Sequence, residues 1–561
     1  MTGPFAPSLP HTPLPSAALV DKLREHAPLW AMGTEEPGHQ RALAGALLRA
    51  AGAEPGLAAV AAGLLLWSWQ QRPLQTAALM PLRDLDRAHP FLAEPCRRLA
   101  RTLADRLDAG ADTTGLDDLL ASEDHARTLR TLLPLVGHPE QGLAWLAGCW
   151  DFLMRLGRED LPPALLDAAP FDPATEPLKA RLTAEWALHY RPAEEALGRV
   201  RGLDAAVFAP HCRLWEAELL LRLGQREAAV DLLATLWRAM PANAAAGLKL
   251  HALARPAPQA DPAGEDVCVL LYSWNKAGLV ARVLDRLAGT DLGGAPVFVL
   301  DNGSTDHMAA VLEDKAALFG ADRFFPISLP VNVGAPAARN WLLSLPRVRA
   351  CAWAAFLDDD ALPEADWLAR LLGAARSRPA PPGAVGCRIT SAKTPVAMQS
   401  ADYHLFPPRP GHKTFSDMEE RIMVFENCGG QLDDGRFAYR RPAASVSGCC
   451  HLLHMPAVQA VGGFDIRFSP TQFDDLERDL RLGLAGWEVY YAGDVAIRHV
   501  QHSSLARAKG LTAMAQVFGN KIKLEGLYSE ADVRTLAEAG LARGWDDLAG
   551  KWRELAEDFG G

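Results

Sequence analysis

The spacing of apolar residues changes at a stretch rich in proline and alanine, residues 256–265, and this change limits the possible folds. Before the stretch, apolar side chains recur every three or four residues, as they do in amphipathic helices. After it, short apolar runs alternate with helical segments, which is the pattern of an α/β domain with a mostly parallel sheet. Because 561 residues are also too many for one hydrophobic core, we expect a multidomain chain, all-α first and α/β second.

The domain boundaries follow from composition and spacing. The first residues are rich in proline and lack the basic start of a signal peptide, so we expect a disordered tail. The proline-rich stretch cannot pack a core and should stay extended as a linker. The expected units are a tail at 1–16, a helical domain at 17–255, the linker at 256–265, an α/β domain at 266–505 and a helical C-terminal extension at 506–561.

The helical half contains a weak repeat. Gly224 lies between two amphipathic segments and Pro241 follows the second, an arrangement that resembles a tetratricopeptide repeat. Gly157 and Arg191 precede Gly224 at a period near 34 residues. An irregular helical bundle is the alternative interpretation. Helical-hairpin arrays usually present a concave binding surface, which could hold a protein partner, although the sequence names no ligand for it.

Charge and cysteine content restrict the partners and the location. The formal net charge is −11, which argues against general binding to nucleic acid. The nine cysteines include no C-x-x-C pair, which is typical of reduced thiols in the cytoplasm. The most apolar early run, residues 56–69, is short for a membrane span. We therefore expect a cytoplasmic protein without a transmembrane segment, either free or peripheral at the inner face of the membrane.

Polar residues follow each of the four strand-like runs in the second half. They are Asn275 after the first run, Asp301 at the end of the second, Asn332 and Arg339 after the third, and Asp358–Asp360 after the fourth. In open α/β sheets, ligands bind at the carboxyl ends of the strands. These residue types therefore predict a polar binding site at one edge of the sheet.

The three adjacent aspartates at 358–360 would repel one another. A divalent cation among them would remove this repulsion, because hard cations prefer carboxylate oxygens. The alternative is an acidic turn in which Asp360 caps the following helix.

Short motifs follow one another through the second half of the chain. They are YSWN at 272–275, VLDNGSTD at 299–306, the segment 332–340, FLDDD at 356–360, the segment 447–453, VGGFD at 461–465, FDDLERDLR at 473–481, and the segment 486–491 that leads to His499. In this order and spacing they resemble a family 2 glycosyltransferase of the GT-A fold. The resemblance covers about residues 266–505 and implies a Rossmann-like domain that binds a nucleotide sugar.

The same resemblance implies which residues bind the nucleotide-diphosphate sugar. Asp301 matches the residue that accepts a hydrogen bond from the base, and Asn275, Ser304 and Asp306 would line the same pocket. Arg339 would lie near the diphosphate. The alternative for Arg339 is an arginine on a helix surface, paired with an acid.

A divalent cofactor, Mn²⁺ or Mg²⁺, is also implied by the resemblance. Asp360 would hold the metal, and Asp358 would contact the metal or the donor ribose. His499 falls where many GT-A enzymes place a third ligand, with His502 as the alternative, although a histidine here could instead be structural. A cation bound to both phosphates stabilises the charge of the leaving group.

Direct displacement of the diphosphate requires a base for the acceptor proton. The family uses the second acid of a Glu–Asp pair, and this chain has Asp474-Asp475 at that position. The resemblance therefore implies Asp475 as the base and Asp474 as a residue that binds the acceptor. A helix N-terminus rich in acids is the alternative.

Together these features predict a metal-dependent inverting glycosyltransferase that uses a nucleotide-sugar donor. Its acceptor would be a hydroxyl of a glycan, a lipid-linked glycan or a protein, which the helical domain could recruit. One alternative is a protein-binding scaffold with a vestigial transferase domain. Another is a nucleotidyltransferase, although residues 272–280 lack a glycine-rich phosphate loop with a lysine. Segment 388–446 contains loop-like stretches that we expect to cover the acceptor site.

Overall fold

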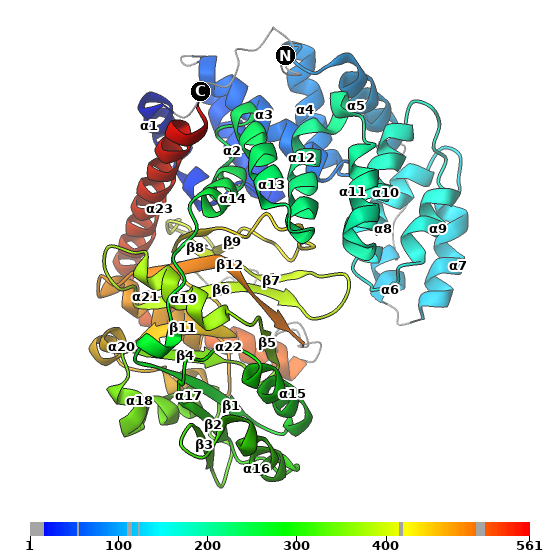
Figure 1. Ribbon diagram of the computed structural model, residues 1–561. Helices are drawn as coiled ribbons and strands as arrows, with labels where there is room; N and C mark the ends of the chain where they lie inside the picture. The colour runs from blue at the N-terminus through cyan, green and yellow to red at the C-terminus, as the bar shows by residue number, and fades with distance from the viewer. Residues whose placement is uncertain are drawn as a thin grey trace.

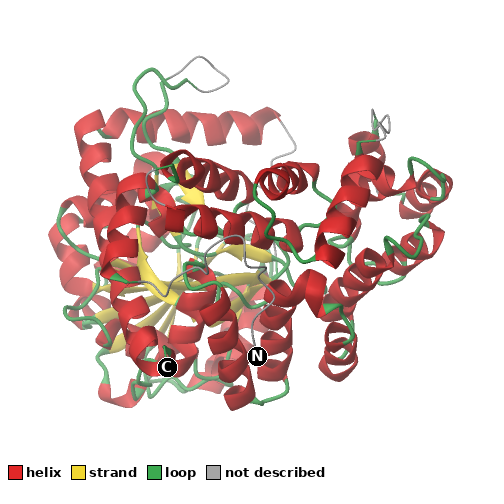
Figure 2. Ribbon diagram, turned by 90° about the horizontal axis from the view of Figure 1, so that it is seen from above, coloured by secondary structure: helices red, strands yellow, loops and turns green. Residues whose placement is uncertain are grey.

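The computed structural model describes residues 16–52, 55–108, 115–121, 124–413, 419–500 and 511–560. Helices form the first half of the chain, and the sheet lies in the second half (Figure 1). A view turned by 90° shows the strands gathered in one part of the molecule with helices around them (Figure 2). The expected order of an all-α and an α/β region is confirmed. Apart from Ser16, the expected tail lies outside the described residues.

Helices account for the first half, as the spacing of apolar residues predicts. They are α1 Ala17–His26, η1 Pro28–Met32, α2 Pro37–Ala50, α3 Pro55–Gln71, α4 Thr76–Ala88, α5 Glu94–Leu107, α6 Leu116–Ala121, α7 His125–Val136, α8 Gly142–Leu153, α9 Leu161–Ala168, α10 Glu176–Tyr190, α11 Ala193–Arg201, α12 Ala205–Arg222, α13 Arg226–Ala239 and α14 Ala244–Ala254. No helix in the described part of the chain is long and apolar enough to cross a membrane.

The three positions of the weak repeat lie in turns between consecutive helices. Gly157 lies between α8 and α9, Arg191 between α10 and α11, and Gly224 between α12 and α13. Gly157 and Gly224 have φ values of +75° and +74°, which glycine adopts without steric cost. The period therefore marks successive helix pairs. Membership of the tetratricopeptide class stays a prediction.

A mixed sheet forms the centre of the second half. Its strands are β1 Val267–Ser273, β2 Val297–Asp301, β3 Phe324–Ser328, β4 Trp353–Leu357, β5 Ala361–Pro363, β6 Ala384–Ser391, β7 Met398–Ser400, β10 Arg440–Ala443, β11 Cys450–His454 and β12 Val489–His499, while β8 Tyr403–Leu405 pairs with β9 Val424–Glu426 separately. The helices of this half are η2 Pro262–Gly264, α15 Ala277–Ala288, α16 Met308–Phe319, α17 Ala335–Ser344, α18 Pro346–Ala350, α19 Trp367–Arg376, α20 Met455–Val461, η3 Ile466–Phe468, α21 Asp474–Leu484, α22 Leu511–Leu527 and α23 Glu530–Phe559.

The strand order is β10-β12-β6-β11-β4-β1-β2-β3. Strand β1 runs parallel to β2 and β4, and β2 runs parallel to β3, as the first four apolar runs predict. Strand β11, however, lies antiparallel between β4 and β6. It begins at Cys450 opposite Leu357, at the edge where β4 ends, and therefore runs back across the sheet. Strands β5, β7 and β10 also pair antiparallel with their neighbours, so the sheet is mixed and not mostly parallel as expected.

The expected linker packs against the second half. The Ala260 N–H donates to the Ala369 carbonyl at 3.1 Å, and a Cβ on Gly373 would lie 1.8 Å from the Pro258 oxygen. The proline-rich stretch is therefore held against α19, and its residues 262–264 form η2. The division into separately folding domains stays a prediction.

The C-terminal helix α23 contacts both halves of the chain. The Trp545 indole N–H donates to the Pro28 carbonyl at 2.8 Å, and His251 of α14 lies 2.8 Å from Glu554. Lys551 donates to the carbonyl of Arg440 in β10. The helical extension thus joins the helical region to the edge of the sheet.

Residues 427–436, which we call the docking segment, contact the helical region. The Trp215 indole donates to Asp434 Oδ2 at 3.1 Å, and Lys249 Nζ donates to the Gly435 carbonyl at 2.7 Å. Arg436 Nη1 lies 2.9 Å from Glu35 Oε2, and both residues are buried. This part of segment 388–446 is therefore occupied by contacts with the helices. That loops of the segment cover the acceptor site stays a prediction.

Candidate active site

The carboxyl ends of β1, β2 and β4 lie side by side. Ser273 at the end of β1 is in register with Asp301 at the end of β2, and β4 on the other side of β1 ends immediately before Asp358. Adjacent parallel strands bring these ends to one edge of the sheet. The polar residues that follow the strands therefore meet, as the sequence predicts.

The loops after β1 and β2 are fastened to each other by the residues expected to bind the donor. The Asn275 N–H donates to Ser304 Oγ at 2.9 Å, and the Ala277 N–H donates to Asp306 Oδ2 at 3.0 Å. The Ser304 N–H donates to Asp301 Oδ1 at 2.9 Å. These contacts hold the two loops against each other at the strand ends.

Trp274 is a candidate functional residue that the sequence reasoning did not single out. It lies between Ser273 and Asn275, and half of its surface is exposed. A large aromatic face exposed at a strand end is available for stacking against a planar group. The feature of the sequence that could have identified Trp274 is its aromatic side chain within the YSWN motif.

The three adjacent aspartates have different partners. Asp358 Oδ1 lies 3.8 Å from Arg339, Asp359 Oδ1 lies 2.8 Å from Lys276, and Asp360 Oδ1 lies 2.8 Å from His499. Ser273 Oγ also donates to Asp359 at 2.7 Å. The repulsion among the acids is thus reduced by three separate basic groups. Lys276 was not predicted, because nothing in the sequence pairs it with Asp359.

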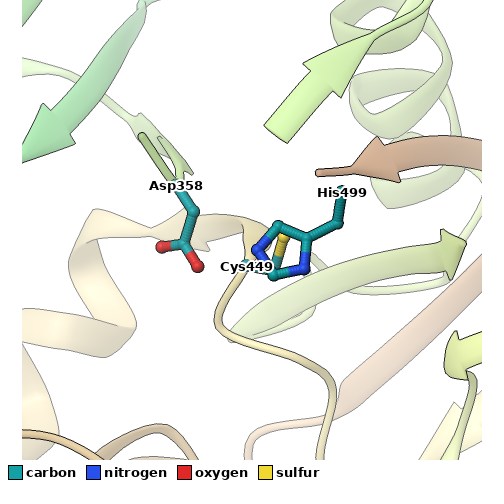
Figure 3. A group of neighbouring side chains, drawn as sticks. All are labelled: Asp358, Cys449 and His499. Carbon is teal, nitrogen blue, oxygen red and sulfur yellow. The ribbon is translucent and has the colours of Figure 1, made fainter. Parts of the chain in front are cut away.

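Asp358 and His499 converge with Cys449 into one cluster. One potential ligand atom from each residue lies within 4.8 Å of the other two (Figure 3). Burial raises the pKa of Asp358 to about 7, although Arg339 and His499 oppose this shift. A divalent cation would favour the ionised carboxylate here. Burial also raises the pKa of Cys449, so its thiol stays protonated.

Asp360, the expected metal ligand, lies outside this three-residue cluster. It is 2% exposed and contacts His499 Nε2, so it lies next to the cluster through the histidine. Burial opposes the charge of His499, yet the hydrogen bond and the negative charge of Asp360 raise the pKa of the ring. A carboxylate and an imidazole suit Mn²⁺, whereas Mg²⁺ takes oxygen ligands almost exclusively. His502 lies outside the described residues.

Arg339 is buried, not located on a helix surface. Its Nη1 donates to Asp474 Oδ2 at 2.7 Å, and its Nη2 donates to the Gly448 carbonyl at 3.3 Å. The guanidinium carbon also lies 5.3 Å from the centre of the Tyr272 ring. The distances to Asp358 and Asp474 show that Arg339 links the end of β4 to the start of α21.

The two expected catalytic acids differ in accessibility. Asp474 is 2% exposed and paired with Arg339, whereas Asp475 is half-buried. The Gly448 N–H donates to Asp475 Oδ2 at 2.9 Å, and a Cβ on Gly448 would lie 2.8 Å from that oxygen. Asp475 is therefore oriented by a close backbone contact and remains reachable. The surroundings of Asp474 suit a positioning role better than the expected contact with the acceptor.

A comparison with solved structures finds glycosyltransferases. GalNAc-T7 with UDP, GalNAc and Mn²⁺ is 10% identical over 42% of this chain and 44% of its own, with a TM-score of 0.34. The mannosyltransferase PcManGT from Pyrobaculum calidifontis, in complex with GDP-Man and Mn²⁺, is 18% identical over 59% and 86%, with a TM-score of 0.33. S. aureus TarS is 14% identical over 40% and 36%, with a TM-score of 0.28. The chain thus spans less than half the length of GalNAc-T7 and of TarS.

A comparison with curated protein sequences finds no match. The sequence model of a family described as glycosyl transferase family 2 matches residues 268–428. The matched range begins in β1 and includes the strand ends with Asp301, Arg339 and Asp358. It ends before Cys449, Asp475 and His499 are reached. The chain therefore carries a family 2 glycosyltransferase domain.

Proposed function

We propose that the protein is a metal-dependent inverting glycosyltransferase that moves a sugar from a nucleotide-diphosphate donor to an acceptor hydroxyl. The observation that carries the proposal is the convergence of Asp358 and His499 within 4.8 Å, connected through Arg339 to the helix that begins with Asp474 and Asp475. Arg339 thus contacts both Asp358, at the proposed cation site, and Asp474, which precedes the reachable carboxylate of Asp475. Direct displacement needs both the cation and the carboxylate near the reacting carbon.

Donor binding is assigned to the loops after β1 and β2. The donor would contact the linked residues Asn275, Asp301, Ser304 and Asp306. The exposed indole of Trp274 can stack on the nucleotide base. Asp358 and His499 would hold Mn²⁺, with Asp360 beside them. When bound, the cation would stabilise the negative charge that develops on the diphosphate.

Asp475 is the proposed base. Its carboxylate would take the proton of the acceptor hydroxyl as that oxygen forms a bond to the anomeric carbon and the bond to the diphosphate breaks. The Gly448 N–H holds one carboxylate oxygen, which limits the orientations that Asp475 can adopt. Arg339 neutralises Asp474 at the same helix end, so two adjacent carboxylates need not both remain unpaired there.

A cytoplasmic location remains part of the proposal. All nine cysteines lie among the described residues, and all nine are free thiols. Free thiols are typical of reducing compartments. The acceptor is proposed only as a hydroxyl of a glycan, a lipid-linked glycan or a protein, and a protein partner on the helical domain stays a prediction.

The proposal is tested by thermal unfolding of the full chain with a panel of nucleoside diphosphates, with and without Mn²⁺. A ligand that binds only the folded state raises the unfolding temperature. We expect one diphosphate to do so in a metal-dependent way, and we expect Asp358→Asn to abolish the effect. Asp322→Asn, at an exposed position, is the matched control. The absence of any shift in the folded wild-type protein would favour the scaffold with a vestigial domain.

A further inference from the structure

Gln399 of strand β7 contacts the proposed metal ligand His499. Its Oε1 lies 2.6 Å from His499 Nδ1, and its Nε2 lies 3.5 Å from the carbonyl oxygen of the same residue. The carbonyl orients the amide, because it can only accept from Nε2. The amide oxygen then accepts from Nδ1, which must carry the ring proton. His499 Nε2, on the side of Asp360, is the nitrogen left for a metal ion.

We propose that Gln399 is a positioning residue for His499, and that the helical region holds Gln399 in place through the docking segment, residues 427–436. The proposal rests on the proposed function, because His499 needs a positioned ring only if it binds a metal. When a group that fixes the tautomer and orientation of a metal-bound histidine is mutated, metal affinity typically falls about 10–100-fold.

Strand β7 is held between β6 and the docking segment. On one side, Thr390 of β6 pairs with Met398. On the other side, the Met398 N–H donates to the Gln431 carbonyl at 2.8 Å, and the Asp433 N–H donates to the Val396 carbonyl at 2.8 Å. The backbone that carries Gln399 thus depends on the position of the docking segment.

The docking segment is held in turn by buried charges of the helical region. Asp434 and Arg436 pair with each other, and Arg436 also pairs with Glu35. Lys249 Nζ lies 2.6 Å from Glu218 while it donates to the Gly435 carbonyl. Separating buried ion pairs leaves uncompensated charges, so the segment has one strongly preferred position. A continuous set of contacts therefore runs from the helices to His499.

The contact next to the histidine is tested with Gln399→Met and Gln399→Glu in the full chain. The readouts are Mn²⁺ affinity, from electron paramagnetic resonance of free Mn²⁺, and the hydrogen bond at His499 Nδ1, from ¹⁵N NMR of the metal-free protein, in which Nε2 contacts Asp360. We expect Gln399→Met to weaken Mn²⁺ binding about 10–100-fold and to lose the hydrogen bond at His499 Nδ1. Gln399→Glu should keep both properties, because its carboxylate also accepts from Nδ1. Gln459→Met, on α20, is the control substitution.

The results separate this inference from the function on which it rests. If wild-type protein binds no Mn²⁺, the proposed function fails and the positioning role fails with it. If wild-type protein binds Mn²⁺ and Gln399→Met binds it equally well, only the positioning role is overturned.

The contribution of the helical region is tested at the far end of the docking segment. A Cβ on Gly435, where φ is +78°, would lie 1.8 Å from Glu218 Oε2. Gly435→Ala should therefore displace the segment and weaken Mn²⁺ binding about tenfold. Gly430→Ala is the matched control, because its φ of +65° carries similar backbone strain but its Cβ meets nothing within 4 Å. Equal Mn²⁺ affinity in the two variants would overturn the role of the helical region.

Discussion

Arg339 and Asp474 form a buried ion pair in which Nη1 donates to Oδ2 at 2.7 Å. The same guanidinium lies 3.8 Å from Asp358 and donates to the carbonyl of Gly448. Arg339, on α17, thus connects the end of β4, which carries the proposed metal ligand Asp358, to α21, which carries the proposed base Asp475. This side chain therefore contributes to the relative positions of these two groups.

Replacing Arg339 should destabilise the fold. Arg339→Met leaves the Asp474 carboxylate buried without its counter-charge, and such a loss typically costs about 3–5 kcal/mol of unfolding free energy. Urea unfolding followed by circular dichroism measures this cost. The double variant Arg339→Met/Asp474→Asn should recover part of it, because the buried negative charge is removed as well. An Arg339→Met protein as stable as wild type would contradict the pairing.

Adding one carbon at Gly448 should impair activity. In Gly448→Ala, the new Cβ would lie 2.8 Å from Asp475 Oδ2 and 3.0 Å from Arg339 Nη2, so the carboxylate must move. A displacement of about 1 Å at a catalytic group can lower turnover about 100-fold. The rate of nucleoside-diphosphate release measures turnover. Gly278→Ala, where a Cβ meets nothing within 4 Å, should leave the rate unchanged.

Removing the charge of Asp475 should separate catalysis from binding. Asp475→Asn cannot accept the acceptor proton, so kcat should fall about 10²–10⁴-fold. Binding of the nucleoside diphosphate and Mn²⁺ should remain, because Asp475 belongs to neither of their proposed sites. Isothermal titration calorimetry together with initial rates checks both expectations. Near-normal turnover in Asp475→Asn would point to another base.

His189 should make stability depend on pH. Burial lowers the pKa of His189 to about 3, with the charge of Arg222 acting in the same direction, whereas an unfolded histidine titrates near pH ~6.5. Between these values the unfolded state binds a proton that the folded state does not. Stability should therefore fall as pH decreases from about 6.5 towards 3, by at most about 1.4 kcal/mol per pH unit from this group.

The pH effect of His189 is isolated by comparison with variants. His189→Gln should flatten the pH dependence of the unfolding free energy in that window, whereas His307→Gln, at an exposed position, should not. Unfolding in urea at several pH values provides the measurement. Parallel curves for wild type and His189→Gln would refute the assignment.

Strands β1 to β4 could be predicted because they are almost continuously buried or strongly apolar. Every residue of β2 and β4 is buried, so each appears in the sequence as an unbroken apolar run that stops at a polar residue. Four of the five residues of β11 are buried as well, but the direction of this strand depends on where the preceding segment enters the sheet. Local residue patterns carry no information about that entry point.

The candidate site was only partly predictable for the same reason. Asp358 and Asp475 lie within recognisable motifs, so their roles could be predicted from the sequence. Cys449 and Lys276 were not assigned to the site, because each meets an aspartate that is more than 80 residues distant in the sequence. Gln399 lies in a segment without a motif, and its contact with His499 depends on the position of β7, which pairs with β6 and contacts the docking segment.

The sequence alone determined the order of a helical and an α/β region, the four parallel strand ends and the residue types gathered at them. These features follow from local periodicity and turn chemistry, which act over a few residues. Tertiary structure decided that Asp358, Asp359 and Asp360 turn to Arg339, Lys276 and His499, respectively. Tertiary structure also decided that the docking segment contacts the helical region, because a buried charge is stable only where the folded chain provides a partner for it.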